Sequence, residues 1–245
     1  MKNWLTKTKT GKLVFWLIFP AAAYLLLTFS IRFSMVYLAQ FFENPTALIA
    51  NPMFTATYSA LVYSSVLAAI YFIPKRFFGF ELSKKEIGFS KEITFTDFAL
   101  GIIGLIISLI LAGALTQLAG QFIPNFDANQ QQNLGYYGLV YPYQFMVVFC
   151  FLAIVPAIVE ETIFRGIIYG ELRQINPWLA MILVSILFGA AHFQLNVAIT
   201  TFAMSLVMCF IREKFTDTIW AGVVLHFLKN ALAFVLLYMM PSLWM

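Results

Sequence analysis

The chain has 245 residues, of which 62% are hydrophobic and only 11% are charged, and its net charge is +4. A soluble domain carries about 25% charged residues because its surface faces water, so this composition excludes an ordinary soluble domain. Apolar runs of about 20 residues recur along the chain and are long enough to cross a hydrocarbon core about 30 Å thick. They predict an all-α fold, a polytopic transmembrane helical bundle that forms a single membrane domain over residues 1–245.

Seven spans are predicted in chain order. They cover residues 13–38, 53–74, 97–121, 142–170, 177–193, 196–211 and 218–240. The first run follows several lysines but is too long for a signal-peptide core, so we interpret it as a span. The boundary near 193–196 offers few residues for a turn, and the long fourth run could hold a further break. A count of eight spans therefore stays open.

The basic residues predict the orientation of these spans. If the N-terminus is cytoplasmic, 13 of the 15 basic residues lie in inner segments or around the inner end of span four: Lys2, Lys7, Lys9, Lys12, Lys75, Arg76, Lys84, Lys85, Lys91, Arg165, Arg173, Arg212 and Lys214. The outer segments contain no lysine or arginine; they are residues 43–52, 123–141, 194–195 and 241–245. This bias follows the positive-inside rule, so we expect a cytoplasmic N-terminus. Topology accounts for the positive charge, and nothing supports binding to nucleic acid.

Two segments outside the spans have distinct compositions. Residues 75–96 mix charges of both signs with Phe and Ile, which is typical of an amphipathic piece at the inner membrane surface. Residues 123–141 are polar and rich in Gly, Asn and Gln, which predicts a loop on the outer side.

Three short patterns in the C-terminal half place ionisable groups inside or beside apolar runs. They are Glu160-Glu161-Thr162-Ile163-Phe164-Arg165, then Phe188-Gly189-Ala190-Ala191-His192, then His226-Phe227-Leu228-Lys229-Asn230. Each charge inside a membrane costs roughly 2.5–3.5 kcal/mol or more, so such groups are candidates for function. The chain has two histidines in all, and both belong to these patterns.

Helical spacing separates the two glutamates. Adjacent residues on a helix point about 100° apart, so one carboxylate can face a cavity while the other faces a neighbouring helix. Glu161 and Arg165 are at i and i+4, which favours an ion pair and leaves Glu160 for other chemistry. His226 and Asn230 are also at i and i+4, so they share one face of the last span.

This combination of side chains is suited to hydrolysis by water. A poorly hydrated carboxylate beside imidazoles can act as a general base on water. Histidine and asparagine donors can stabilise the oxyanion that forms when water attacks an amide carbonyl. Glutamate and histidine are also good zinc ligands, and a zinc-bound water would perform the same reaction. We expect no cofactor, and the residues leave zinc open as an alternative.

The three patterns, in this order on late spans, resemble the motifs of the CAAX protease and bacteriocin-processing family. It is also called the Abi family and includes the eukaryotic Ras-converting prenyl-protein endopeptidase. The resemblance covers roughly residues 142–235, which would form the catalytic core. It implies a metal-independent intramembrane glutamate endopeptidase, and we expect it in a bacterial cell membrane. Its substrate would be a membrane-associated peptide or protein, in bacteriocin or signal-peptide maturation or in self-immunity.

The resemblance also implies a role for each motif residue. Glu160 would activate the water and His192 would help to position it. His226 and Asn230 would form the oxyanion site. The supporting residues would be Glu161, Arg165 and Phe188. Nothing in the sequence indicates the oligomeric state.

Two other functions use the same residues. A non-catalytic membrane scaffold or immunity protein would bind a peptide or receptor partner and keep these groups as interhelical hydrogen bonds. A transporter would use the carboxylate and the histidines as a proton relay. The ionisable groups cluster in one half of the chain with no matching set in the other, which speaks against a transporter.

Overall fold

The computed structural model describes residues 4–5, 8–132 and 134–240. Within these ranges the regular structure is entirely helical. The chain forms two compact units, one made of residues 1–82, 134–159 and 230–245 and the other of residues 83–133 and 160–229. Two of the lysines assigned to the inner side, Lys2 and Lys7, lie outside the described residues, as does the expected outer segment 241–245.

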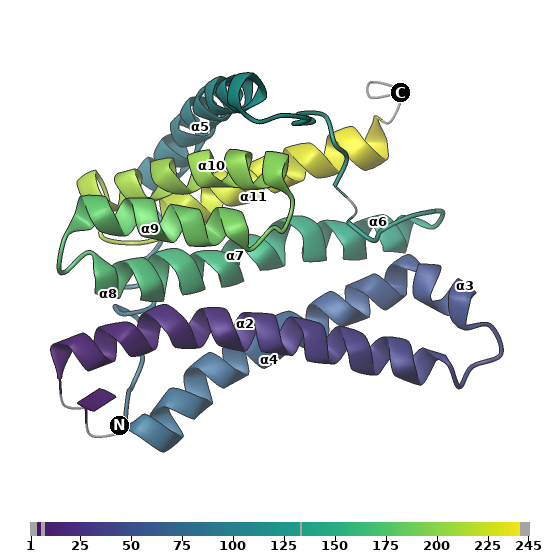
Figure 1. Ribbon diagram of the computed structural model, residues 1–245, viewed down its shortest axis with the longest axis horizontal. Helices are drawn as coiled ribbons and strands as arrows, with labels where there is room; N and C mark the ends of the chain where they lie inside the picture. Colours follow the sequence, from purple (N-terminus) through teal and green to yellow (C-terminus); the bar gives the residue numbers. More distant parts are fainter. Residues whose placement is uncertain (1–3, 6–7, 133, 241–245) are drawn as a thin grey trace. The chain divides into compact units, whose positions relative to one another are not determined.

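The first unit is built on two long helices that pack against each other, α2 and α4 (Figure 1). Its elements are α2 (Lys9–Ala39), α3 (Pro45–Ala50), α4 (Pro52–Phe78), α6 (Pro142–Phe149), the π-helix η1 (Cys150–Ile154), the first residues of α7 (Val155–Glu161), the end of α11 (Trp220–Phe234) and the π-helix η3 (Val235–Met239). A small buried core joins α4, the loop before α6, α6 itself and α11 through Ala56, Tyr136, Val148 and Phe234.

The second unit contains the first two motifs and the histidine of the third. Its elements are α5 (Phe95–Phe122), the end of α7, the π-helix η2 (Thr162–Tyr169), α8 (Gly170–Leu172), α9 (Pro177–Ala190), α10 (Leu195–Lys214) and most of α11. Helix α10 packs against both α5 and α9 (Figure 1). The helices α9 and α10 approach closely because Gly189 has no side chain: a Cβ there would lie 2.7 Å from the carbonyl oxygen of Ala198.

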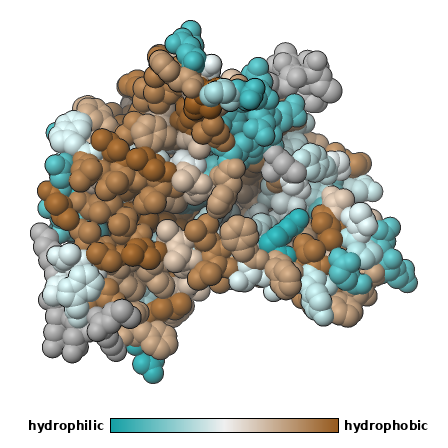
Figure 2. Space-filling model, in the orientation of Figure 1, coloured by the Kyte–Doolittle hydropathy of each residue, from teal (hydrophilic) through white to brown (hydrophobic). Residues whose placement is uncertain are grey.

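Six helical stretches are long and apolar enough to cross a membrane, and the protein is a multi-pass membrane protein. Large hydrophobic side chains are exposed along them, as expected for surfaces that face lipid. Figure 2 shows hydrophobic residues covering much of the visible face, including the surface over α9. Helix α9 corresponds to the fifth predicted span but has only 14 residues. At 1.5 Å per residue it is about 21 Å long, shorter than a hydrocarbon core of about 30 Å.

Local sequence signals explain where the helices begin. The Asn51 and Asn176 side chains cap α4 and α9, and each is followed by a proline in the first turn. Thr94 and Asp97 form a reciprocal capping box at the start of α5. Helix α4 ends at Phe78 and is capped by Gly79, which has a φ of 72°, a conformation that glycine adopts without steric cost.

The connecting segments differ in part from the prediction. The described residues of 123–141 form a loop as expected, whereas residues 75–78 are the last turn of α4 and residues 79–94 form turns and irregular structure. The predicted span 177–193 was too long at its C-terminal end. Helix α9 ends at Ala190, and Phe193 has a φ of 53°, which a continuing α-helix does not allow.

Candidate active site

The helix that carries the two glutamates changes from α-helical to π-helical directly after them. Helix α7 ends at Glu161, and the π-helix η2 begins at Thr162. A π-helix bonds each residue to the fifth one along and is frequent at functional sites. All eight residues of η2 are buried. Sequence spacing did not predict this change, because apolar periodicity does not distinguish a π-helical stretch from an α-helical one.

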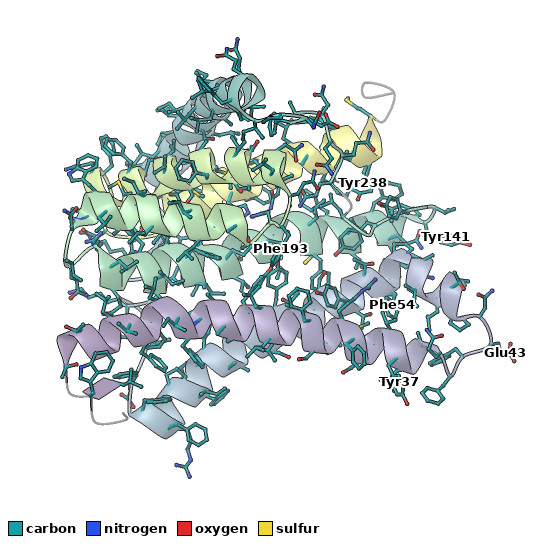
Figure 3. The ribbon with its side chains drawn as sticks, in the orientation of Figure 1. Tyr37, Glu43, Phe54, Tyr141, Phe193 and Tyr238 are labelled. Carbon is teal, nitrogen blue, oxygen red and sulfur yellow. The ribbon has the colours of Figure 1, made fainter. Side chains whose placement is uncertain are left out.

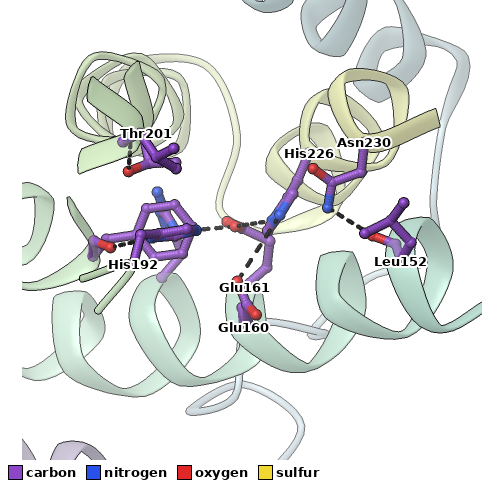
Figure 4. Close-up of polar contacts among 10 residues, drawn as sticks. Leu152, Glu160, Glu161, His192, Thr201, His226 and Asn230 are labelled. Carbon is purple, nitrogen blue, oxygen red and sulfur yellow. Dashed lines mark hydrogen bonds and ion pairs between the residues drawn. The ribbon is translucent and has the colours of Figure 1, made fainter. Parts of the chain in front are cut away.

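Glu161 is the centre of a buried charged network (Figure 4). Its Oε1 atom accepts a hydrogen bond from Arg165 Nη1 at 2.9 Å, so the ion pair predicted from the i, i+4 spacing is present. The same oxygen lies 3.0 Å from His226 Nδ1. All three residues are at most 3% exposed. The contact with His226 was not predicted, since the spacing argument assigned Glu161 to Arg165 alone.

The second oxygen of Glu161, Oε2, lies close to the backbone of a glycine, Gly222. A Cβ atom added to Gly222 would lie 3.0 Å from Glu161 Oε2, closer than ordinary van der Waals contact. Gly222 is four residues before His226, on the same face of α11. Sequence reasoning did not single out this residue. Its signal was an isolated glycine in an apolar helix, one turn from a motif histidine.

Glu160 faces the other nitrogen of the same imidazole. Its Oε2 atom lies 3.9 Å from His226 Nε2, and the residue is 9% exposed. This separation is too long for a direct hydrogen bond, but polar atoms at such a distance can be bridged by water. His226 thus has one nitrogen on Glu161 and the other toward Glu160 (Figure 4).

Phe188 packs among the charged and imidazole groups. The Arg165 guanidinium lies over its ring, 4.2 Å from the centroid. The imidazoles of His192 and His226 meet the same ring in T-shaped contacts, with centroids 5.2 Å and 5.8 Å away. Phe188 is fully buried, and its ring contacts all three of these groups.

His192 lies in the turn after α9 and not within a helix. Its Nδ1 atom is 2.9 Å from the carbonyl oxygen of Phe188. A carbonyl oxygen only accepts hydrogen bonds, so Nδ1 carries the hydrogen and Nε2 of the neutral ring is the acceptor. His192 can therefore accept a hydrogen bond from water through Nε2.

Asn230 belongs to the first unit, four residues after His226 on α11. Its Nδ2 atom donates a hydrogen bond to the carbonyl oxygen of Leu152 at 3.0 Å. An amide nitrogen has two hydrogens, so one donor remains for another acceptor. The oxyanion role expected for Asn230 stays a prediction.

The second unit therefore brings together six of the seven residues singled out from the sequence, namely Glu160, Glu161, Arg165, Phe188, His192 and His226. Among the residues that the structure describes, no group of three His, Cys, Asp or Glu side chains is arranged to hold a metal ion.

A family comparison covers this region. Residues 142–232 match the family described as type II CAAX prenyl endopeptidase Rce1-like, and the match includes all three motifs. It supports the resemblance inferred from the motifs. No curated protein and no solved structure matches the chain.

Proposed function

Because residues 142–232 carry an Rce1-like domain, which implies a membrane protease of the CAAX type, we propose that Glu160 is its general base. The reaction is hydrolysis of a peptide bond in a membrane-associated peptide or protein. Water is the nucleophile, and no covalent intermediate with the enzyme forms.

The observation that carries this proposal is the placement of Glu160 opposite His226. Glu160 Oε2 and His226 Nε2 lie 3.9 Å apart and belong to buried residues, so one water molecule beside the line joining them could reach both atoms. A water molecule in that position would contact the carboxylate that removes its proton. Its oxygen would attack the scissile carbonyl carbon, and Glu160 would then return the proton to the leaving amine.

His226 has to be protonated to stabilise the oxyanion. With Glu161 ionised, Nδ1 is the donor to Glu161 Oε1, and Nε2 of the neutral ring is only an acceptor. A second proton on Nε2 makes it a donor, and the Glu161 carboxylate stabilises that cation. The buried Glu161–Arg165 pair thus holds the His226 ring in its orientation, while His192 positions water through Nε2.

The experiment is a comparison of Glu160→Gln with Glu92→Gln. Glu92 is an exposed glutamate in the segment before α5 and serves as the matched control. Peptides are profiled in membranes that contain each variant at equal expression, and the cleaved product is then assayed with purified protein. We expect a loss of about 10²–10⁴-fold for Glu160→Gln, the usual contribution of a general base, and none for the control.

A folded Glu160→Gln variant that still cleaves the substrate would disprove the proposal. A protective phenotype that survives in this variant would instead favour the non-catalytic immunity protein. The thermal stability of both variants has to match that of the wild type, so that lost cleavage is not confused with unfolding.

A further inference from the structure

The turn that carries His192 is short and has an unusual backbone. Helix α9 ends at Ala190 and α10 begins at Leu195. Phe193, next to His192, has a φ of 53°, in the left-handed region that non-glycine residues rarely occupy. Figure 3 labels Phe193 at this junction. Such a conformation persists only where surrounding contacts hold it, and it is frequent at functional sites.

Two amide side chains at the start of α10 tie this turn to an earlier segment of the chain. Asn196 Nδ2 donates to the carbonyl oxygens of Ala128 and Gln130, at 3.1 Å and 2.9 Å. Gln194 Nε2 donates to the Gln130 carbonyl at 2.9 Å and to Asn196 Oδ1 at 2.8 Å. The backbone of residues 127–130, between α5 and α6, is thereby tied to the turn.

Helix capping alone does not explain this arrangement. Gln194 is the N-cap residue of α10, but its side chain makes no capping hydrogen bond. It binds the segment 127–130 instead. Asn196 is 9% exposed, and both hydrogen bonds of its amide group to Ala128 and Gln130 are to main-chain oxygens. Because the acceptors are main-chain oxygens, these hydrogen bonds hold the backbone of the segment 127–130 and not one of its side chains.

We propose that the segment 127–130 is a positioning element for His192, and that Gln194 and Asn196 are the positioning residues. They hold the turn so that His192 Nδ1 keeps its hydrogen bond to Phe188 and Nε2 faces the reacting water. Both act through His192 and do not touch the substrate. The catalytic consequence rests on the proposed function, whereas the effect on the His192 ring does not.

The test uses the fact that the chain has only two histidines. The full-length protein is labelled with nitrogen-15 at histidine and studied by NMR in detergent micelles. His192→Gln assigns the signals. We expect Asn196→Ala and Gln194→Ala to shift or broaden the His192 ring signals and to leave those of His226 unchanged. Gln131→Ala, an exposed residue next to the anchored segment, is the matched control and should change neither ring.

Activity gives the second readout. We expect Asn196→Ala to lower kcat by about 10-fold with little change in KM, because a displaced catalytic group weakens the transition state more than substrate binding. Unchanged His192 signals in both variants would overturn the proposal. If Asn196→Ala does not fold, the His192 signals of Gln194→Ala, a variant at a less buried position, provide the test. Glu160→Gln leaves the tie intact, so an active Glu160→Gln would remove the proposed function without affecting this result.

Discussion

Glu161 and His226 are separated by 65 positions in the chain, yet Glu161 Oε1 and His226 Nδ1 are 3.0 Å apart. The same oxygen accepts from Arg165, so one buried carboxylate joins the first motif to the third. This contact gives the second glutamate of the motif a task different from that of the first. Glu161 Oε1 lies at Nδ1 of the imidazole, and Glu160 Oε2 faces Nε2 of the same ring at 3.9 Å.

The first prediction concerns the buried pair. Arg165→Met leaves the Glu161 carboxylate without its guanidinium partner, and removal of one partner of a buried pair costs about 3–5 kcal/mol. We expect a large fall in thermal stability, measured in detergent. The double variant Glu161→Gln/Arg165→Met removes both charges and should regain most of the stability. It should remain inactive, because His226 has lost its anionic partner; recovery of activity would contradict the role assigned to Glu161.

The second prediction concerns Gly222. Alanine there would push Glu161 Oε2 by a few tenths of an ångström, while Oε1 is held by two donors. Because small displacements of catalytic groups are costly, we expect Gly222→Ala to reduce kcat by about 10-fold. Gly113→Ala is the control, since a Cβ at that helical glycine meets nothing within 4 Å. Equal activities of the two variants would show that Glu161 tolerates the displacement.

The third prediction concerns orientation. In a variant whose native cysteines are replaced by alanine, a cysteine at Gln131 should react with a membrane-impermeant reagent applied from outside. A cysteine at Lys84 should react only after the membrane is opened, because the positive-inside rule predicts that the basic segment lies inside. Both positions are exposed. The reverse labelling pattern would place the loop 123–141 in the cytoplasm.

The fourth prediction separates the glutamate mechanism from a zinc mechanism. Cleavage by purified protein should persist after treatment with excess chelator, and added zinc should not stimulate it. A catalytic zinc would supply the activated water, so its removal would abolish turnover. Loss of activity on chelation, restored by zinc, would refute the metal-independent proposal.

Much of the site could be predicted from the spacing of a few residues. The Glu161–Arg165 pair follows from the i, i+4 rule, and it survives the π-helix because a slightly wider turn still brings these positions to one side. The membrane class follows from composition, because long apolar runs with few charges have no soluble alternative.

Other features depend on tertiary contacts that no local pattern encodes. The His226–Glu161 bond joins distant parts of the chain. The need for glycine at position 222 arises mainly from the Glu161 carboxylate that lies opposite it. The turn at His192 was assigned to a span because its residues are mostly apolar. Gln194 and Asn196 hold its conformation through hydrogen bonds to a segment more than 60 residues earlier in the chain.

The length of α9 has a consequence for the surrounding lipid. Its 14 residues reach about 21 Å, whereas the other long apolar helices have at least 20 residues. If α9 crosses the bilayer, as the sequence predicts, lipid next to it would face a hydrophobic mismatch, which a bilayer relieves by local thinning at a modest cost per ångström. The end of α9 precedes His192, so we expect this thinning to occur beside the proposed catalytic residues. Acyl-chain length would then act as a rate-controlling variable, with faster cleavage in short-chain bilayers than in long-chain ones.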